Sequence, residues 1–126
     1  MATQTGRVVL VVEDDPGVRR PLEKFLELHG FRVVGAQTVD EAIDAIQKYR
    51  PAAAVVDLRL AQGSGRDVVI SIPAGVPVII FSGVPSESAQ LERLRPRTRL
   101  IQKPYSLVML VEGLQEMLAN ANQPES

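Results

Sequence analysis

Short apolar runs rich in valine and isoleucine recur along this chain, and segments with helical spacing separate them. The first run, Arg7 to Val12, and the third, Ala53 to Asp57, are apolar almost throughout. An acidic residue stands at the carboxyl end of each. Strands buried on both faces of a parallel sheet have this composition, whereas strands with one wet face alternate apolar and polar residues. The pattern therefore predicts an α/β fold built around a parallel sheet.

Capping and turn signals give the boundaries of the elements. Pro16 suits a first helical turn, Gly30 suits a helix stop, and Thr38 with Glu41 forms a capping box. The expected strands are Arg7 to Val12, Phe31 to Ala36, Ala53 to Asp57, Val76 to Phe81 and Arg99 to Gln102. The expected helices begin at Pro16, Thr38, about Arg66, Ser86 and Ser106. Five strands that alternate with five helices predict helices on both faces of the sheet.

The length of 126 residues fits one domain, with a core from about residue 6 to 119 and a frayed tail over 120–126. The absence of cysteine excludes disulfides, thiolate catalysis and cysteine-bound metals. No apolar run approaches the roughly 18 residues of a membrane span, so we expect a cytoplasmic protein that contacts no membrane. A net charge of −1 argues against direct nucleic-acid binding. The arginines from Arg93 to Arg99 are interpreted as a solvated stretch.

Polar side chains stand at the carboxyl ends of four expected strands. In doubly wound folds, ligands bind just beyond these ends, where the strand order reverses. The residues there are Glu13, Asp14 and Asp15 after the first strand, Asp57 at the end of the third, Ser82 and Gly83 after the fourth, and Lys103 and Pro104 after the fifth. Because the carboxyl ends of parallel strands meet at one edge of the sheet, we expect these groups to converge.

The carboxylates predict a site for a hard cation. Two carboxylates a few ångströms apart repel by ~4 kcal/mol at an effective dielectric constant of about 20, and oxygen ligands without His or Cys favour Mg²⁺ or Mn²⁺. Asp57 stands alone at a strand end and is the candidate nucleophile, which leaves Glu13 and Asp14 for the metal. Ser82 and Lys103 would contact phosphoryl oxygens. Together these groups are the ones that phosphoryl transfer requires.

Four stretches carry a resemblance to a known family. VVLVVEDDPGVRRPL, AAAVVDLRL, VPVIIFSG and LIQKPYS occur in the order, and nearly at the spacing, found in receiver domains of two-component response regulators. The chain resembles this family over almost its whole length. The resemblance implies a flavodoxin-like, doubly wound sheet of five parallel strands in the order 2-1-3-4-5.

The resemblance also implies roles for the acidic residues. Asp57 would accept a phosphoryl group and also be a metal ligand, Asp14 would bind Mg²⁺ directly, and Glu13 would act through water. The backbone carbonyl of Arg59 would be a further metal ligand.

By the same resemblance, Ser82 would be the switch hydroxyl and Lys103 would pair with the phosphate, with a cis bond before Pro104. Two features depart from the family. Leu100 occupies the position of a Tyr or Phe that swings inward in other receivers. The segment between Asp57 and Ser82 is also short and rich in proline, which predicts an abbreviated third helix and an altered partner surface near it.

The implied function is phosphorylation-dependent signalling, by a stand-alone receiver or one excised from a longer protein. A histidine kinase or phosphotransfer protein would phosphorylate Asp57, and the face made by the fourth helix, fifth strand and fifth helix would then change its preference for a downstream protein partner or form a homodimer. Such a domain catalyses only its own phosphorylation and a slow dephosphorylation. The loss of phosphate is expected to be slow because neither Arg59 nor Val84 is a good base for water.

Two alternatives remain open from the sequence. One is a pseudo-receiver that binds partners without phosphorylation, which the absent aromatic at Leu100 makes conceivable. The other is a small Mg²⁺-dependent phosphatase with an aspartyl intermediate. Such phosphatases usually carry a second aspartate two residues after the nucleophile, and Arg59 occupies that position here.

Overall fold

The computed structural model describes residues 7–60, 63–82, 90–93, 95, 97–102 and 106–121. Its elements in chain order are β1 (Val8–Val12), α1 (Pro16–Leu28), β2 (Arg32–Ala36), α2 (Val39–Tyr49), β3 (Ala53–Asp57), α3 (Gly65–Ser71), β4 (Val78–Ser82), β5 (Thr98–Gln102) and α5 (Leu107–Ala121). Residues 90–93 are also helical. The start of the helix predicted from Ser86 lies outside the described residues.

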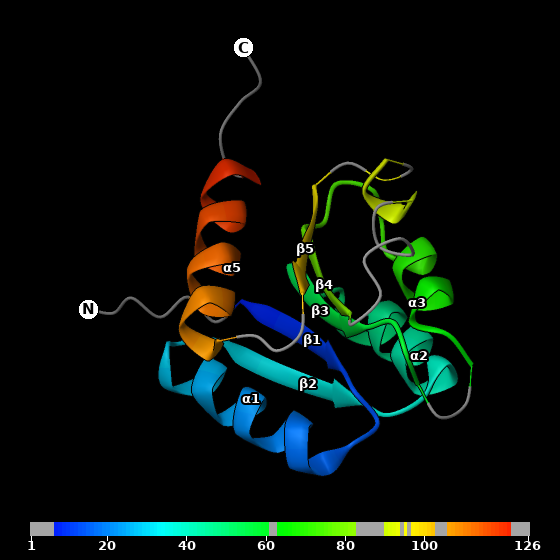
Figure 1. The fold of residues 1–126 in the computed structure, drawn as a ribbon, viewed down its shortest axis with the longest axis horizontal. Helices are drawn as coiled ribbons and strands as arrows, with labels where there is room; N and C mark the ends of the chain where they lie inside the picture. Colours follow the sequence, from blue (N-terminus) through cyan, green and yellow to red (C-terminus); the bar gives the residue numbers. More distant parts are fainter. Residues whose placement is uncertain are drawn as a thin grey trace.

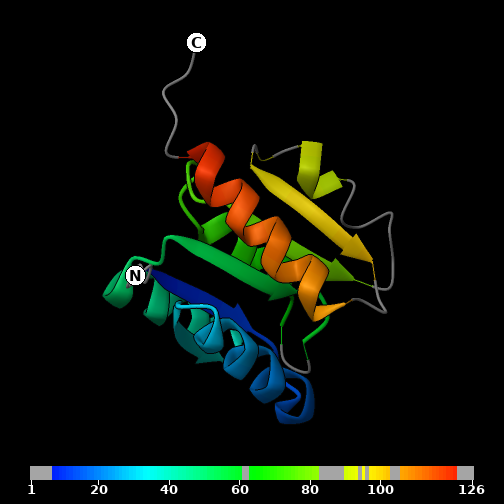
Figure 2. The ribbon, with the colours of Figure 1, turned by 90° about the vertical axis from the view of Figure 1, so that its left-hand side faces the viewer.

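The five strands form one all-parallel sheet in the order β2-β1-β3-β4-β5, which confirms the expected fold. Figure 2 shows their arrowheads pointing toward one edge of the sheet. The chain leaves β1 for β2 on one side and reaches β3 on the other, so the order reverses between β1 and β3. Val12 of β1 pairs with Val56 of β3. Glu13 directly follows Val12, and Asp57 directly follows Val56. The two predicted acids therefore lie at the point of reversal, where ligands bind in such sheets.

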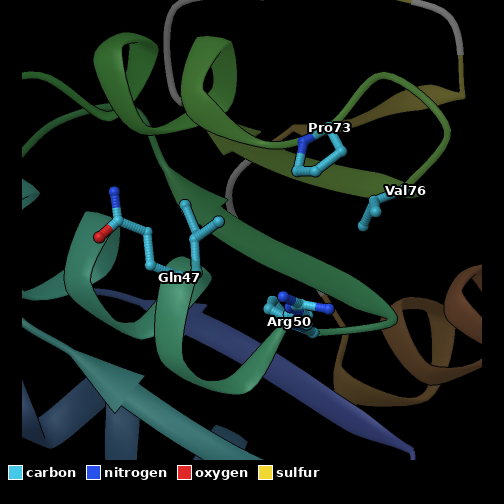
Figure 3. Close-up of a pocket in the computed structure, with 6 residues that line it drawn as sticks. Gln47, Arg50, Pro73 and Val76 are labelled. Carbon is cyan, nitrogen blue, oxygen red and sulfur yellow. The ribbon is translucent and has the colours of Figure 1, made fainter.

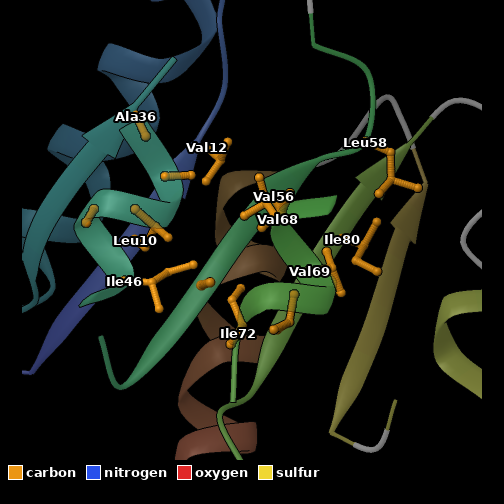
Figure 4. Packing of buried hydrophobic residues seen from close by; sticks show 14 of the residues in the cluster. Leu10, Val12, Ala36, Ile46, Val56, Leu58, Val68, Val69, Ile72 and Ile80 are labelled. Atoms are coloured by element: carbon orange, nitrogen blue, oxygen red, sulfur yellow. The ribbon is translucent and has the colours of Figure 1, made fainter. Parts of the chain in front are cut away.

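Helices cover both faces of the sheet, as predicted. α1 and α5 lie over one face, and α2 and α3 lie over the other (Figure 1). Because successive side chains of a strand point to opposite faces, Val9 and Val11 pack with the first pair of helices, whereas Leu10 and Val12 pack with the second pair. Figure 4 shows the second of these cores, in which side chains of α2 and α3 meet those of β1, β3 and β4.

Local capping fixes the starts of the first two helices. α1 begins at Pro16, as predicted, and the Asp15 carboxylate caps it by accepting the Gly17 N–H at 2.8 Å. Before α2, Thr38 Oγ1 accepts the Glu41 N–H at 3.1 Å. The Glu41 carboxylate in turn accepts the N–H of Gln37, one residue before the cap, at 2.8 Å. Both caps satisfy backbone donors that a helix leaves without partners.

α3 has only seven residues, which confirms the abbreviated third helix. It ends because Ile72 is extended, with φ −80° and ψ 135°, as the residue before a proline tends to be. The Val76 N–H then closes a turn onto the Pro73 carbonyl at 3.0 Å. β4 consequently begins at Val78, two residues later than predicted, and Ser82 is its last residue. Among the described residues, no helix is both long enough and apolar enough to cross a membrane.

Candidate functional site

Four of the predicted site residues meet at the carboxyl edge of the sheet. Glu13 directly follows β1, Asp57 ends β3 and Ser82 ends β4; their exposed fractions are 3%, 3% and 0%. Asp14 is half-buried beside them. Asp57 pairs in register with Phe81, so Ser82 stands one residue further toward the same edge.

Asp57 is held by the turn that follows it. Its Oδ1 accepts the Arg59 N–H at 3.0 Å. The backbone at Asp57 and Leu58 lies directly against Gly65, the first residue of α3. A Cβ at position 65 would overlap the Asp57 carbonyl oxygen and stand 2.7 Å from the Leu58 Cα. Because Gly65 has no side chain, the start of α3 can pack directly against the backbone of the candidate phosphoacceptor Asp57 and of Leu58.

Glu13 carries the largest electrostatic perturbation described in the site. Burial raises the pKa of its carboxyl group from 4.5 to about 8, the Asp15 N–H opposes this rise, and the neighbouring Asp57 and Asp14 carboxyl groups add to it. The Asp15 N–H donates to Glu13 Oε2 at 3.0 Å. The other oxygen, Oε1, is buried and has no hydrogen-bond partner in the structure. Three carboxyl groups thus lie close together here, and burial favours the neutral form of Glu13. Its Oε1 could contact a donor or a hydrated cation.

The donor set fits a hard cation that completes its shell with other oxygens. Within the described ranges, no group of three or more His, Cys, Asp or Glu side chains is placed to hold a metal by itself. An ion at this edge would therefore also take backbone and water oxygens, which Mg²⁺ commonly does. The expected ligands Glu13, Asp14, Asp57 and the Arg59 carbonyl are compatible with such a shell, and their metal-binding roles stay predictions.

Part of the predicted site lies outside the described residues. Lys103, Pro104, Gly83 and Val84 belong to this part. Gln102, the residue before the lysine, pairs in register with Ser82, so β5 ends at the same edge as β4.

Arg19 belongs to the neighbourhood of the site although no sequence pattern singled it out. This α1 residue is 7% exposed, and its Nη1 donates to the backbone carbonyl of Glu13 at 3.0 Å. In the sequence it has the spacing of an ordinary helical partner of Glu23, four residues later. In the sequence, only its position six residues after the acidic strand end relates Arg19 to the site; its burial is seen once α1 is docked on the sheet.

The interpretation of Arg93 to Arg99 as a solvated stretch is wrong for Arg95. Arg95 is 7% exposed, and its Nη2 donates to the carbonyls of Pro73 at 2.5 Å and Val76 at 2.7 Å. Its Nη1 donates to Thr98 Oγ1 at 3.1 Å. Arg95 therefore ties the turn before β4 to the segment before β5. Arg93, in contrast, is exposed, as predicted.

Leu100, which the sequence resemblance aligns with an aromatic residue of receiver domains, is half-buried on β5. Its N–H donates to the Glu92 carboxylate at 3.0 Å, which links β5 to helical residues 90–93.

A groove of about 510 Å³ lies at the opposite edge of the sheet, away from the acidic residues. Its lining residues are Ile46, Gln47, Arg50, Pro51, Pro73 and Val76. Figure 3 shows it between the end of α2 and the turn before β4. Its lining is mainly apolar and contains no carboxylate, so it is separate from the candidate site.

Comparison with known proteins agrees with this geometry. The family model for the response regulator receiver domain matches residues 9–115. The phyllosphere-induced regulator PhyR of Methylorubrum extorquens is 34% identical over 110 residues, covering 83% of this chain and 41% of that protein. The chain spans roughly a third to a half of the length of the curated relatives that it matches.

Solved structures give the same result. The receiver domain of PhyR from Erythrobacter litoralis, solved by NMR, has a TM-score of 0.82 at 28% identity and covers 98% of this chain and 97% of its own. A CheY-like receiver domain from Methanospirillum hungatei has a TM-score of 0.85 at 22% identity, over 93% of this chain and 97% of its own. The second likeness bears on the fold alone. With the family match over most of its length, the chain belongs to the response regulator receiver domain family, a family of signalling domains.

Proposed function

We propose that Asp57 accepts a phosphoryl group from a histidine kinase or a histidine phosphotransfer protein, with Mg²⁺ as the cofactor. The observation that carries the proposal is the burial of the Asp57 side chain beside the Glu13 carboxyl group, whose Oε1 is also buried and has no hydrogen-bond partner in the structure. Buried carboxyl groups placed together in this way could bind a divalent cation next to a phosphoryl group. A turn with only a structural role does not require several buried carboxyl groups.

The chemistry is the transfer of one phosphoryl group between two side chains. An Asp57 carboxylate oxygen forms the new O–P bond while the N–P bond of the donor's phosphohistidine breaks. The electron pair of that bond returns to the imidazole nitrogen, which takes up a proton. Bound Mg²⁺ would neutralise charge on the phosphoryl oxygens and the carboxylates.

The remaining site residues would position the product. Ser82, buried at the end of β4, can donate its hydroxyl to a phosphoryl oxygen, and Lys103 follows the paired strand β5 and would supply a positive charge. Movement of these groups toward the phosphate would alter the face formed by residues 90–93, β5 and α5, and so its preference for a downstream partner or a second copy of the chain. We expect the phosphorylated form to be long-lived, because the exposed Arg59 is a poor base for water.

Intact mass spectrometry after incubation with a small phosphodonor tests the proposal. Wild-type protein and Asp57→Asn are incubated with acetyl phosphate, with and without Mg²⁺. We expect one phosphoryl adduct on the wild type, dependent on Mg²⁺, and none on the variant. Asp15→Asn is a matched control, since it removes an exposed carboxylate of the same loop and should leave the adduct in place.

No adduct on folded wild-type protein with Mg²⁺ present would contradict the proposal. That outcome would favour the phosphorylation-independent binding module, and the search would move to partners of the unmodified protein.

A further inference from the structure

We propose that Arg19 is a positioning residue for the candidate metal site, held by Glu23 in a space that Gly35 leaves open. This inference rests on the proposed function, because it concerns how the loop after β1 is shaped to receive a divalent cation.

The backbone of Glu13 is fixed from both sides. Its N–H donates to the Ala36 carbonyl of β2 at 3.0 Å, and its carbonyl accepts from Arg19 Nη1 at 3.0 Å. Because the peptide unit is planar, a fixed Glu13 carbonyl also fixes the plane of the Asp14 amide and the direction in which Asp14 leaves the strand. Arg19 therefore acts on the orientation of the expected direct metal ligand without contacting the ion.

The arginine is itself immobilised. Its side chain is 9% exposed, and its Nε lies 3.4 Å from Oε2 of Glu23, one turn further along α1. Across from this pair, β2 carries Gly35. A Cβ at position 35 would overlap the Glu23 carboxylate and stand 3.4 Å from the Arg19 Cδ. The absence of a side chain at position 35 thus leaves room for the Arg19–Glu23 pair between α1 and the sheet.

A simple helical ion pair is the competing interpretation, and the geometry distinguishes it. Exposed pairs four residues apart contribute a few tenths of a kcal/mol and need no third partner. Arg19 is instead buried, and its fork reaches a backbone oxygen on another element. The planar guanidinium can serve both oxygens at once, whereas a lysine ammonium is a single point on a flexible stem.

The test measures Mg²⁺ affinity by titration calorimetry at 25 °C, on proteins shown to be folded by circular dichroism. Residues that orient metal ligands typically change metal affinity by 10–100-fold, so we expect Arg19→Gln to weaken Mg²⁺ binding by about 10-fold. Arg20→Gln removes the same charge from the next residue, which is exposed, and should change the affinity by less than about 2-fold.

Arg19→Lys separates geometry from charge and remains informative if the glutamine variant does not fold. We expect weakened Mg²⁺ binding in this variant too, because the charge is kept and the two-oxygen contact is lost. Wild-type affinity in Arg19→Lys, or equal affinities for Arg19→Gln and Arg20→Gln, would overturn the positioning role. Failure of the wild type itself to bind Mg²⁺ would instead refute the proposed function, from which the Arg19 inference follows.

Discussion

Replacement of Arg95 by methionine should cost far more stability than its place in an arginine-rich stretch suggests. Methionine keeps much of the apolar stem and removes the guanidinium. The carbonyl of Val76 and the hydroxyl of Thr98 then lose the Arg95 donor, and the Pro73 carbonyl retains only the donation from the Val76 N–H among the bonds described. The two connections that lead into β4 and β5 would lose this side-chain link and keep the backbone bond from the Val78 N–H to the Arg97 carbonyl.

The size of the effect follows from these contacts. Hydrogen bonds to a charged group each contribute about 1.5–3 kcal/mol. Against this gain stands the cost of desolvating the guanidinium, since burial lowers the pKa of Arg95. Two short bonds to backbone carbonyls, less that cost, give a net loss of about 3 kcal/mol for Arg95→Met. In a domain of this size the loss corresponds to a fall in Tm of roughly 10 °C.

Urea unfolding followed by circular dichroism measures this loss, and Arg93→Met is the matched control. Arg93 is exposed, so its replacement should change the free energy of unfolding by no more than about 0.5 kcal/mol. Arg95→Lys should fall between the two, because one ammonium cannot reach all the acceptors. Equal stabilities of the Arg93 and Arg95 variants would show that the buried clamp contributes nothing and would refute this reasoning.

Three further predictions concern the site and the caps. Gly65→Ala should destabilise the domain by about 2–3 kcal/mol in urea unfolding and reduce Asp57 phosphorylation, whereas Gly75→Ala, with open space around its Cβ, should do neither. In metal-free protein, native Glu13 holds its proton up to a pKa of about 8 against 4.5 when unfolded, so stability should fall as pH rises through this window. Glu13→Gln should flatten that slope, and an unchanged slope would contradict the assignment. Thr38→Ala should cost about 1 kcal/mol, since the α2 cap is lost.

The fold and the acidic edge were predictable because both depend on local signals. Valine-rich runs, helix caps and prolines can each be recognised within a few residues of sequence. In addition, ligands of such folds bind where the strand order reverses, and this rule brings Glu13 and Asp57 together without knowledge of any contact. The shortened α3 follows in the same way from Pro73.

Arg95 and Arg19 were not predictable, for a different reason. The backbone carbonyls that accept from Arg95 lie 19 to 23 residues earlier in the chain, and no local feature separates Arg95 from Arg93. Arg19 has a normal helical spacing to Glu23, and its bond to Glu13 depends on how α1 docks on the sheet. Contacts of this kind become visible only when the tertiary arrangement is known.

The bond between Glu92 and Leu100 bears on how copies of this protein behave at high concentration. β5 is an outer strand of the sheet, and outer strands expose backbone groups onto which a strand of another molecule can add. Here the Leu100 N–H is already occupied by a carboxylate from the same chain. A strand that approached this edge would meet a negative charge in place of a donor. The bond thus removes one backbone donor from the edge at which a strand of another molecule would pair.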